Sequence, residues 1–363
     1  MKSINLPYSP RIDQLRWLAA TLVFLFHFSI KWRASGGGGF DSPWMGLVTE
    51  GHTGVALFFT LSGFLFMRIA QFQGQIRYRP FLRNRILRIL PLYLVIFLVA
   101  LSLSRDQFQP QDILYLLSAN LGHSPTSQSV VTGAAWCIPL EFLFYLMFPW
   151  ISRFALEQGM SYLLRLLALM VFFKLMVYSE SGNSTLMYFS TFVGRFDQFL
   201  VGMLAAMALQ RHEARLQRLA GRLLPAAALL VVCASAAQAR YAPLNVQPKA
   251  AFWILWSLIE SCCWAGLILS WVGWQGRLPA WLERLLAHGG KISFSFYLLH
   301  MGVIQMAAQN VGMVAPTGVG WLDAALVLAL LYGCVWGLAT LCYHTVEEPF
   351  LRLRGGYGVF QTG

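Results

Sequence analysis

Arg16 and His27 lie eleven residues apart in RWLAATLVFLFH, an otherwise apolar stretch near the N-terminus. On an α-helix this spacing is almost three turns, so both side chains share one face, about 16 Å apart along the helix axis. A histidine can act as a general base near neutral pH, and an arginine can bind a phosphate. The spacing therefore predicts that the two residues serve the two ends of one substrate path, with an anion-binding site at Arg16 and a reacting group at His27.

Arg85 and Arg88 form a second basic group in RYRPFLRNRILRILP, residues 77–91. Residues three apart are neighbours on a helix face, and an arginine pair at a helix start offers bidentate donors to phosphate. Arginines beside a membrane span also satisfy the positive-inside rule without binding a ligand. The residues alone leave both interpretations open.

These side chains must be carried by membrane-spanning helices, because the chain is too apolar for a water-soluble globule. Of its 363 residues, 57% are hydrophobic and only 12% are charged. The apolar segments are about 17 to 23 residues long, which suits helices that cross a bilayer, and they lack the alternation of a β-barrel. We expect an all-α integral membrane protein with about ten helices in a single bundle. The expected spans are roughly 14–33, 54–71, 89–104, 137–151, 161–178, 186–209, 223–239, 250–272, 291–310 and 322–345.

The basic residues predict the orientation of the bundle. Most of the 27 lysines and arginines fall on one side if the N-terminus is cytoplasmic, so both termini are expected in the cytoplasm. We expect one membrane domain over residues 1–350, with an uncleaved first helix, and a short cytoplasmic tail over 351–363. The net charge of +12 follows mostly from this topology and does not indicate a nucleic-acid partner.

Ionisable residues inside the spans are functional candidates, because each costs at least ~2.5 kcal/mol at the bilayer centre unless it is paired or hydrated. Glu141 is expected at a depth similar to that of His27, while His300 is deeper, with Tyr297 one turn before it. Four others fit structural pairs as well as a site: Lys174, Arg195, Asp197 and Glu260. The six cysteines lack the spacing of a zinc site or a disulfide framework, so we expect no metal and no bound cofactor.

The order of several short motifs resembles the membrane acyltransferase-3 family of bacterial integral-membrane O-acyltransferases. The motifs are Arg16 with His27, GVALFFTLSGF at 54–64, Arg85-x-x-Arg88 followed by Pro91 and Tyr93, Trp136-x4-Glu141-x2-Phe144-Tyr145, Ser293-x-Ser295-x-Tyr297-x2-His300, and Glu348–Pro349. The chain departs from the family pattern at Gln14, Trp17, Ala56 and Phe142; at Ala56 the family has an acid. We expect no extracytoplasmic hydrolase-like domain of the kind that some members carry.

The resemblance implies transfer of an acyl group, most often acetyl, from cytoplasmic acyl-CoA to a glycan or lipid-linked sugar hydroxyl beyond the bacterial cytoplasmic (inner) membrane. Arg16, Arg85 and Arg88 would hold the phosphates of CoA. His27 would act as a base, or as a nucleophile that carries the acyl group, and Glu141 would orient it or bind the acceptor. The path or acceptor site would be lined by Asp13, Ser62, Tyr145, Tyr297 and His300.

A membrane transporter or flippase of an acylated or glycan substrate is the competing class, because intramembrane charges also mark substrate pathways. The sequence shows neither an internal repeat nor paired interrupted spans, which argues against a transporter. A non-catalytic scaffold would not explain so many intramembrane polar groups.

Overall fold

The computed structural model describes residues 5–103, 106, 109, 134–183, 188, 191–241, 249–313 and 317–357. Within these ranges the regular elements are helices, without a β-strand. They are α1 (Pro10–Ala34), η1 (Pro43–Met45), α2 (Gly46–Thr49), α3 (Thr53–Gln73), α4 (Tyr78–Leu103), η3 (Ala134–Trp136), α7 (Cys137–Gln158), α8 (Met160–Glu180), α10 (Phe192–Tyr241), α11 (Phe252–Gly273), α12 (Ala280–Asn310), α13 (Gly320–Cys342), the π-helical turn η4 (Tyr343–Glu347) and α14 (Glu348–Leu351).

Seven helices of the described part are long and apolar enough to cross a membrane, which confirms an all-α membrane fold. Every expected span overlaps a helix, but α10 joins the two expected over 186–209 and 223–239, with non-helical backbone at His212 (φ −126°, ψ 27°). The more polar helices α1 and α12 are not among the seven. The count of about ten spans and the cytoplasmic side of the termini therefore stay predictions.

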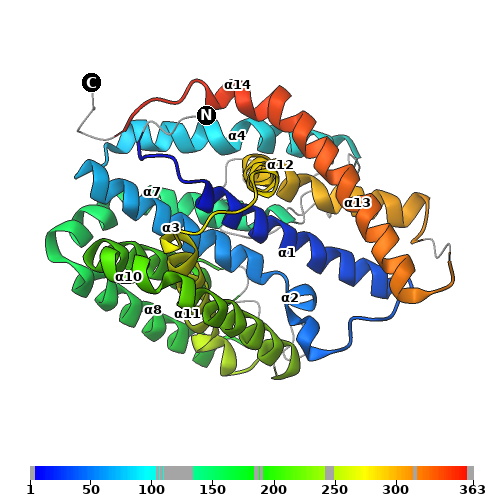
Figure 1. Cartoon of the computed structure of the whole chain (residues 1–363), viewed down its shortest axis with the longest axis horizontal. Helices are drawn as coiled ribbons and strands as arrows, with labels where there is room; N and C mark the ends of the chain where they lie inside the picture. The colour runs from blue at the N-terminus through cyan, green and yellow to red at the C-terminus, as the bar shows by residue number, and fades with distance from the viewer. Residues whose placement is uncertain are drawn as a thin grey trace.

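Helices α1 and α3 occupy the middle of the bundle (Figure 1). One side of α1 packs against α12, and α13 packs against α12 in turn; α3 packs against α1 and against α10, which also contacts α11 and α8. In consequence α1 is covered on two faces. Trp17, Phe24 and Phe28 enter a core with α12 and α13, while Leu15 and Leu22 enter the larger core.

The crossing of α3 and α10 depends on two glycines. A Cβ atom added to Gly63 would lie 2.0 Å from the carbonyl oxygen of Phe199, and one added to Gly202 would lie 1.9 Å from that of Thr60. Small residues let the backbones of membrane helices approach this closely. The SGF end of the GVALFFTLSGF motif therefore places α3 directly against α10.

The four ionisable residues left open by the sequence pair with one another between α8, α10 and α11. Lys174 Nζ lies 2.5 Å from Asp197 Oδ2, and Arg195 lies 3.7 Å from Glu260 Oε2. All four are buried, and Ser257 donates a further bond of 2.6 Å to Asp197. Two cations facing two anions favour the structural interpretation, in which these contacts tie the three helices together.

Candidate active site

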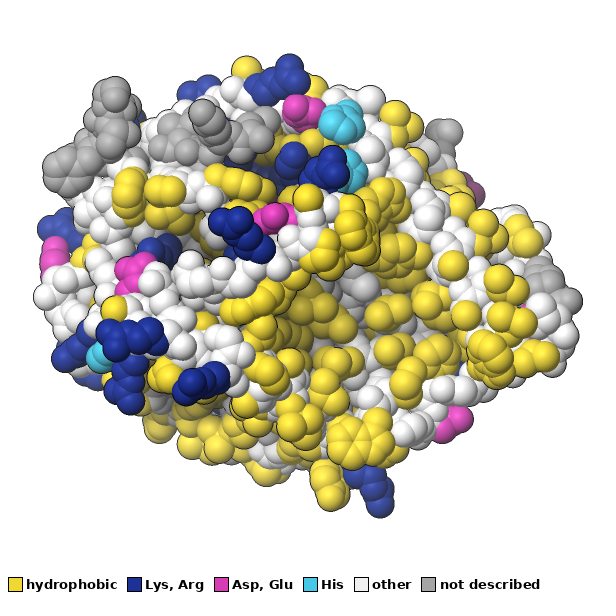
Figure 2. Space-filling view, in the orientation of Figure 1, with side chains coloured by type: hydrophobic (Ala, Val, Ile, Leu, Met, Phe, Trp, Pro, Cys, Tyr) yellow, Lys and Arg dark blue, Asp and Glu magenta, His cyan; other side chains and the backbone are white. Residues whose placement is uncertain are grey.

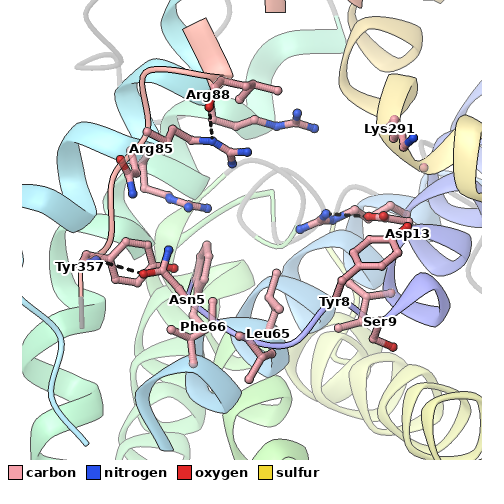
Figure 3. Close-up of a pocket in the computed structure, with 18 of the residues that line it drawn as sticks. Asn5, Tyr8, Ser9, Asp13, Leu65, Phe66, Arg85, Arg88, Lys291 and Tyr357 are labelled. Carbon is pink, nitrogen blue, oxygen red and sulfur yellow. Dashed lines mark hydrogen bonds and ion pairs between the residues drawn. The ribbon is translucent and has the colours of Figure 1, made fainter. Parts of the chain in front are cut away.

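A basic cavity of about 430 Å³ lies where α1 and α4 begin (Figure 3). Its walls come from the segment before α1, the second half of α3, α12 near Gly290 and the residues after α14. Arg16 of α1 and Arg85 and Arg88 of α4 line it together. The three arginines predicted to bind the donor therefore meet at one site, although Arg16 lies about 70 residues before the other two in the sequence. Asp13 lines the same cavity.

The arginines of the cavity differ in how their charge is balanced. Arg16 donates a 3.0 Å hydrogen bond to Asp13, and Arg88 lies 3.2 Å from the buried carboxylate of Glu347. Arg85 has no carboxylate partner among the described residues; its guanidinium lies over the rings of Phe66 and Phe81, with the guanidinium carbon 4.9 and 5.5 Å from the ring centroids. Positive charge is therefore in excess, and the aromatic faces stabilise it without neutralising it.

Three further cations line the cavity and were not predicted as site residues from the sequence. Lys291 lines it from α12 (Figure 3), and Arg352 and Arg354 line it from the segment after α14. Burial, together with Arg88, Arg85 and Arg16, lowers the pKa of Arg354 to about 10, so this arginine stays charged at neutral pH. The cavity therefore suits a ligand with several negative charges.

Glu347, rather than Glu348 of the acid–proline pair, is the acid that reaches the cavity residues. The backbone N–H of Ser295 donates to Glu347 Oε1 at 3.1 Å, and the Ser295 hydroxyl donates to the same oxygen. Glu348 instead contacts His344 and Arg352 at 2.8 and 3.1 Å. The π-helical turn that ends at Glu347 sets this register, as π-helical turns often do at functional sites.

His27 contacts a second predicted site residue, His300. The distance from His27 Nδ1 to His300 Nε2 is 3.0 Å, and His27 Nδ1 is also 3.0 Å from the carbonyl oxygen of Val23. On the other ring, Nδ1 of His300 is 2.5 Å from the carbonyl oxygen of Tyr297. His300 is fully buried, whereas His27 is partly exposed.

These contacts assign the proton positions of the two rings. A carbonyl oxygen only accepts hydrogen bonds, so Nδ1 of each histidine carries the proton. His300 Nε2 then accepts from His27 Nδ1, which leaves Nε2 of His27 unprotonated. The pair therefore presents one basic nitrogen, on the more accessible ring.

Glu141 lies in a separate group of predicted site residues. Ser62 donates a 3.2 Å hydrogen bond to Glu141 Oε1, and Tyr145 donates to the same oxygen. The structure does not bring Glu141 to the ring of His27, which contacts His300 instead. Tyr297 links the two groups: its carbonyl accepts from His300, and its hydroxyl contacts Cys137 Sγ at 3.0 Å, one turn before Glu141.

A further polar network lies next to His27, on the other side from the basic cavity. His52 and Gln238 contact Glu50 Oε2 at 3.1 and 3.0 Å, and the Phe26 ring lies between those of His27 and His52. Ala56, where the resemblance expects an acid, is fully buried. Among the described residues, no group of three or more His, Cys, Asp or Glu could hold a metal ion.

Comparisons with known proteins identify the family of this chain. The acyltransferase-3 model, described as "Acyltransferase domain", matches residues 9–343. The chain is 26% identical over 373 aligned residues to "Acyltransferase MdmB" of Streptomyces mycarofaciens, with 95% of this chain and 92% of the relative covered. No solved structure matches. Because the family model spans nearly the whole chain, this protein belongs to the acyltransferase-3 family and is a membrane acyltransferase of groups other than aminoacyl groups.

Proposed function

We propose that this acyltransferase moves an acyl group, in the simplest case acetyl, from cytoplasmic acyl-CoA to a hydroxyl of a glycan or lipid-linked sugar. The observation that carries the proposal is the path along α1. Arg16 lies in a cavity with four further arginines, and His27 lies on the same helix about 16 Å further along its axis. Membership in the family favours this function over the transporter considered from the sequence.

The donor end of the proposal rests on charge. The pyrophosphate and the 3′-phosphate of CoA are matched by Arg16, Arg85 and Arg88, since guanidinium groups bind phosphate oxygens in bidentate geometry. The pantetheine arm then extends along α1, which brings the thioester towards His27. No bound cofactor is required, because the activated acyl group arrives with the donor.

The chemistry at His27 follows from its proton positions. Nε2 takes the proton from the acceptor hydroxyl while the hydroxyl oxygen attacks the thioester carbonyl. The C–S bond then breaks, and the thiolate of CoA takes the proton back from Nε2. His300 and the carbonyl of Val23 accept from Nδ1 throughout, which stabilises the charged ring. In the alternative route Nε2 attacks the thioester first and carries the acyl group to the acceptor.

Glu141 is proposed to act at the acceptor side. Its contacts with Ser62 and Tyr145 fix the carboxylate on the wall between α3 and α7. A carboxylate held in this way can accept hydrogen bonds from sugar hydroxyls. Tyr297, which connects α12 to this wall through Cys137, is proposed to line the same space.

The test uses sealed inside-out membrane vesicles that contain the wild type or His27→Ala, supplied with CoA labelled in its acetyl group. We expect label in thioester-free glycan or lipid-linked sugar with the wild type, and a rate lower by about 10²- to 10⁴-fold with His27→Ala, the usual contribution of a general base. His212→Ala, at the exposed kink of α10, is the matched control and should keep the wild-type rate. A wild type that consumes neither acetyl-CoA nor longer acyl-CoAs would contradict the proposal.

A further inference from the structure

The chain after α14 folds back over the basic cavity. This C-terminal strap, Arg352–Tyr357, is joined to α4 by the side chain of Asn84. Asn84 Nδ2 donates to the carbonyl oxygen of Gly355 at 2.6 Å, and the Gly355 N–H donates to Asn84 Oδ1 at 3.2 Å. A fixed strap at the edge of a cavity can contribute binding groups that a free tail could not position.

Asn5, before α1, and Arg77, before α4, hold the far end of the strap. The N–H of Tyr357 donates to Asn5 Oδ1 at 3.0 Å, and the N–H of Arg77 donates to the carbonyl oxygen of Tyr357 at 2.9 Å. Tyr357 itself is buried, and its ring lies edge-on to Phe81 with 5.3 Å between the ring centroids. Asn5 and Tyr357 both line the cavity (Figure 3). The described part of the expected tail, up to residue 357, is thus part of the folded bundle.

The two arginines of the strap have different surroundings. The side chain of Arg352 is 71% exposed and bonds Glu348, as a surface arginine usually does. Arg354 is partly buried among Arg16, Arg85 and Arg88, and its Nε donates to the carbonyl oxygen of Leu351 at 3.1 Å. Like charges held together in a partly buried site repel one another, which an anionic ligand would relieve.

We propose that Arg354 is a donor-binding residue, which holds a phosphate of acyl-CoA together with Arg16, Arg85 and Arg88. The strap forms one wall of the donor site, and Asn84 is the positioning residue that fixes it. This inference rests on the proposed function, because it takes acyl-CoA as the donor.

The experiment compares two acetyl donors with the same thioester, acetyl-CoA and acetyl-pantetheine, of which only the first carries phosphates. With the full chain in membrane vesicles, Arg354→Ala should raise KM for acetyl-CoA by about 10- to 100-fold, the effect of losing a hydrogen bond to a charged group, and leave kcat close to wild type. The kinetic constants for acetyl-pantetheine should not change. Arg354→Lys keeps the positive charge but loses the bidentate guanidinium geometry, so its KM for acetyl-CoA should lie between those of the wild type and Arg354→Ala.

Matched variants separate binding from folding. Arg153→Ala removes an exposed arginine that pairs with Glu157 at the end of α7, and should change neither donor's constants. Asn84→Ala should raise KM for acetyl-CoA by less than Arg354→Ala, because the strap is loosened while Arg354 is retained. The amount of folded protein in each membrane is measured by size-exclusion chromatography of a fluorescent fusion.

Three outcomes would overturn the proposal, and they separate it from the proposed function. An unchanged KM for acetyl-CoA in Arg354→Ala, with KM raised in Arg85→Ala and Arg88→Ala, would refute the role of Arg354 alone. Equal losses with both donors would show that Arg354 only maintains the fold. A wild type that consumes no acyl-CoA would refute the proposed function, and the role of Arg354 with it.

Discussion

At the scale of single residues, the partner of His27 determines which of its nitrogens can react. A neutral imidazole has one protonated and one free nitrogen, and the wrong tautomer would direct an N–H at the acceptor hydroxyl. The backbone carbonyls of Val23 and Tyr297 set the proton positions of both rings, and His300 connects them. A second histidine thus contacts His27 where a carboxylate was considered from the sequence.

His300→Ala should lower kcat by about 10²-fold and leave KM for acetyl-CoA nearly unchanged, because the base loses its orienting acceptor while the donor site is intact. His300→Gln should recover part of the rate, since the amide oxygen of glutamine can accept from His27 Nδ1 as Nε2 does. Steady-state kinetics at saturating acceptor measure both constants. An unchanged kcat in His300→Ala, with normal protein levels, would show that His27 needs no orienting partner.

At the scale of the helices, the candidate active site depends on how closely α3 approaches α10. Gly63 provides the approach, and its neighbour Ser62 points to Glu141 on α7. The neighbouring residues Ser62 and Gly63 therefore have two roles: Gly63 allows the crossing with α10, and Ser62 bonds Glu141 on another face of α3. A substitution at this crossing should shift α3 and so displace Ser62 from Glu141.

Gly63→Ala should destabilise the protein by about 1–3 kcal/mol or more, because the added methyl group meets the rigid backbone carbonyl of Phe199. The same result is expected for Gly202→Ala. The control is Gly266→Ala in α11, where a Cβ atom would meet nothing within 4 Å and the helix propensity of alanine is favourable. Thermal unfolding of the detergent-solubilised variants tests this; equal melting temperatures for Gly63→Ala and Gly266→Ala would contradict the close packing.

The sequence could predict those helices and site residues that depend on local signals. Hydropathy is a local property, so each expected span overlaps a helix, and the two spans expected over 186–209 and 223–239 lie on either side of the kink at His212 in α10. Counting residues along a span gives depth but not the direction in which a side chain faces. For this reason Glu141 and His27 could be expected at one depth without being neighbours.

The remaining features of the site depend on contacts between distant parts of the chain. The register of Glu347 is set by a π-helical turn, for which the sequence has no reliable signal. Arg354 enters the cavity because Asn84, on a different helix, bonds the backbone of Gly355. In the sequence, Arg354 is one more basic residue of the expected tail, and nothing there indicates that this segment packs against α4. Long-range hydrogen bonds of this kind were outside what composition and spacing could show.

At the scale of the whole molecule, the charge distribution is asymmetric. On the face that Figure 2 shows, most Lys and Arg side chains lie towards the upper and left edges, and the centre is mainly hydrophobic. The basic cavity belongs to the upper edge, where α4 and α14 lie (Figure 1), because residues of α4 and of the segment after α14 line it. A basic end and an apolar middle agree with the predicted orientation, in which this end faces the cytoplasm.

The orientation predicts which side of the membrane must supply the donor. Acyl-CoA, the proposed donor, carries several phosphate charges and does not cross a bilayer, so we expect only the side with the basic cavity to deliver it. Sealed inside-out vesicles should consume added acetyl-CoA, and sealed right-side-out vesicles should not do so until a detergent or a pore-forming peptide opens them. A C-terminal epitope, detected before and after permeabilisation, reports the orientation of each preparation independently. Equal consumption by both sealed preparations, with the epitope on opposite sides, would show that the donor does not enter through the cavity of Arg16, Arg85 and Arg88.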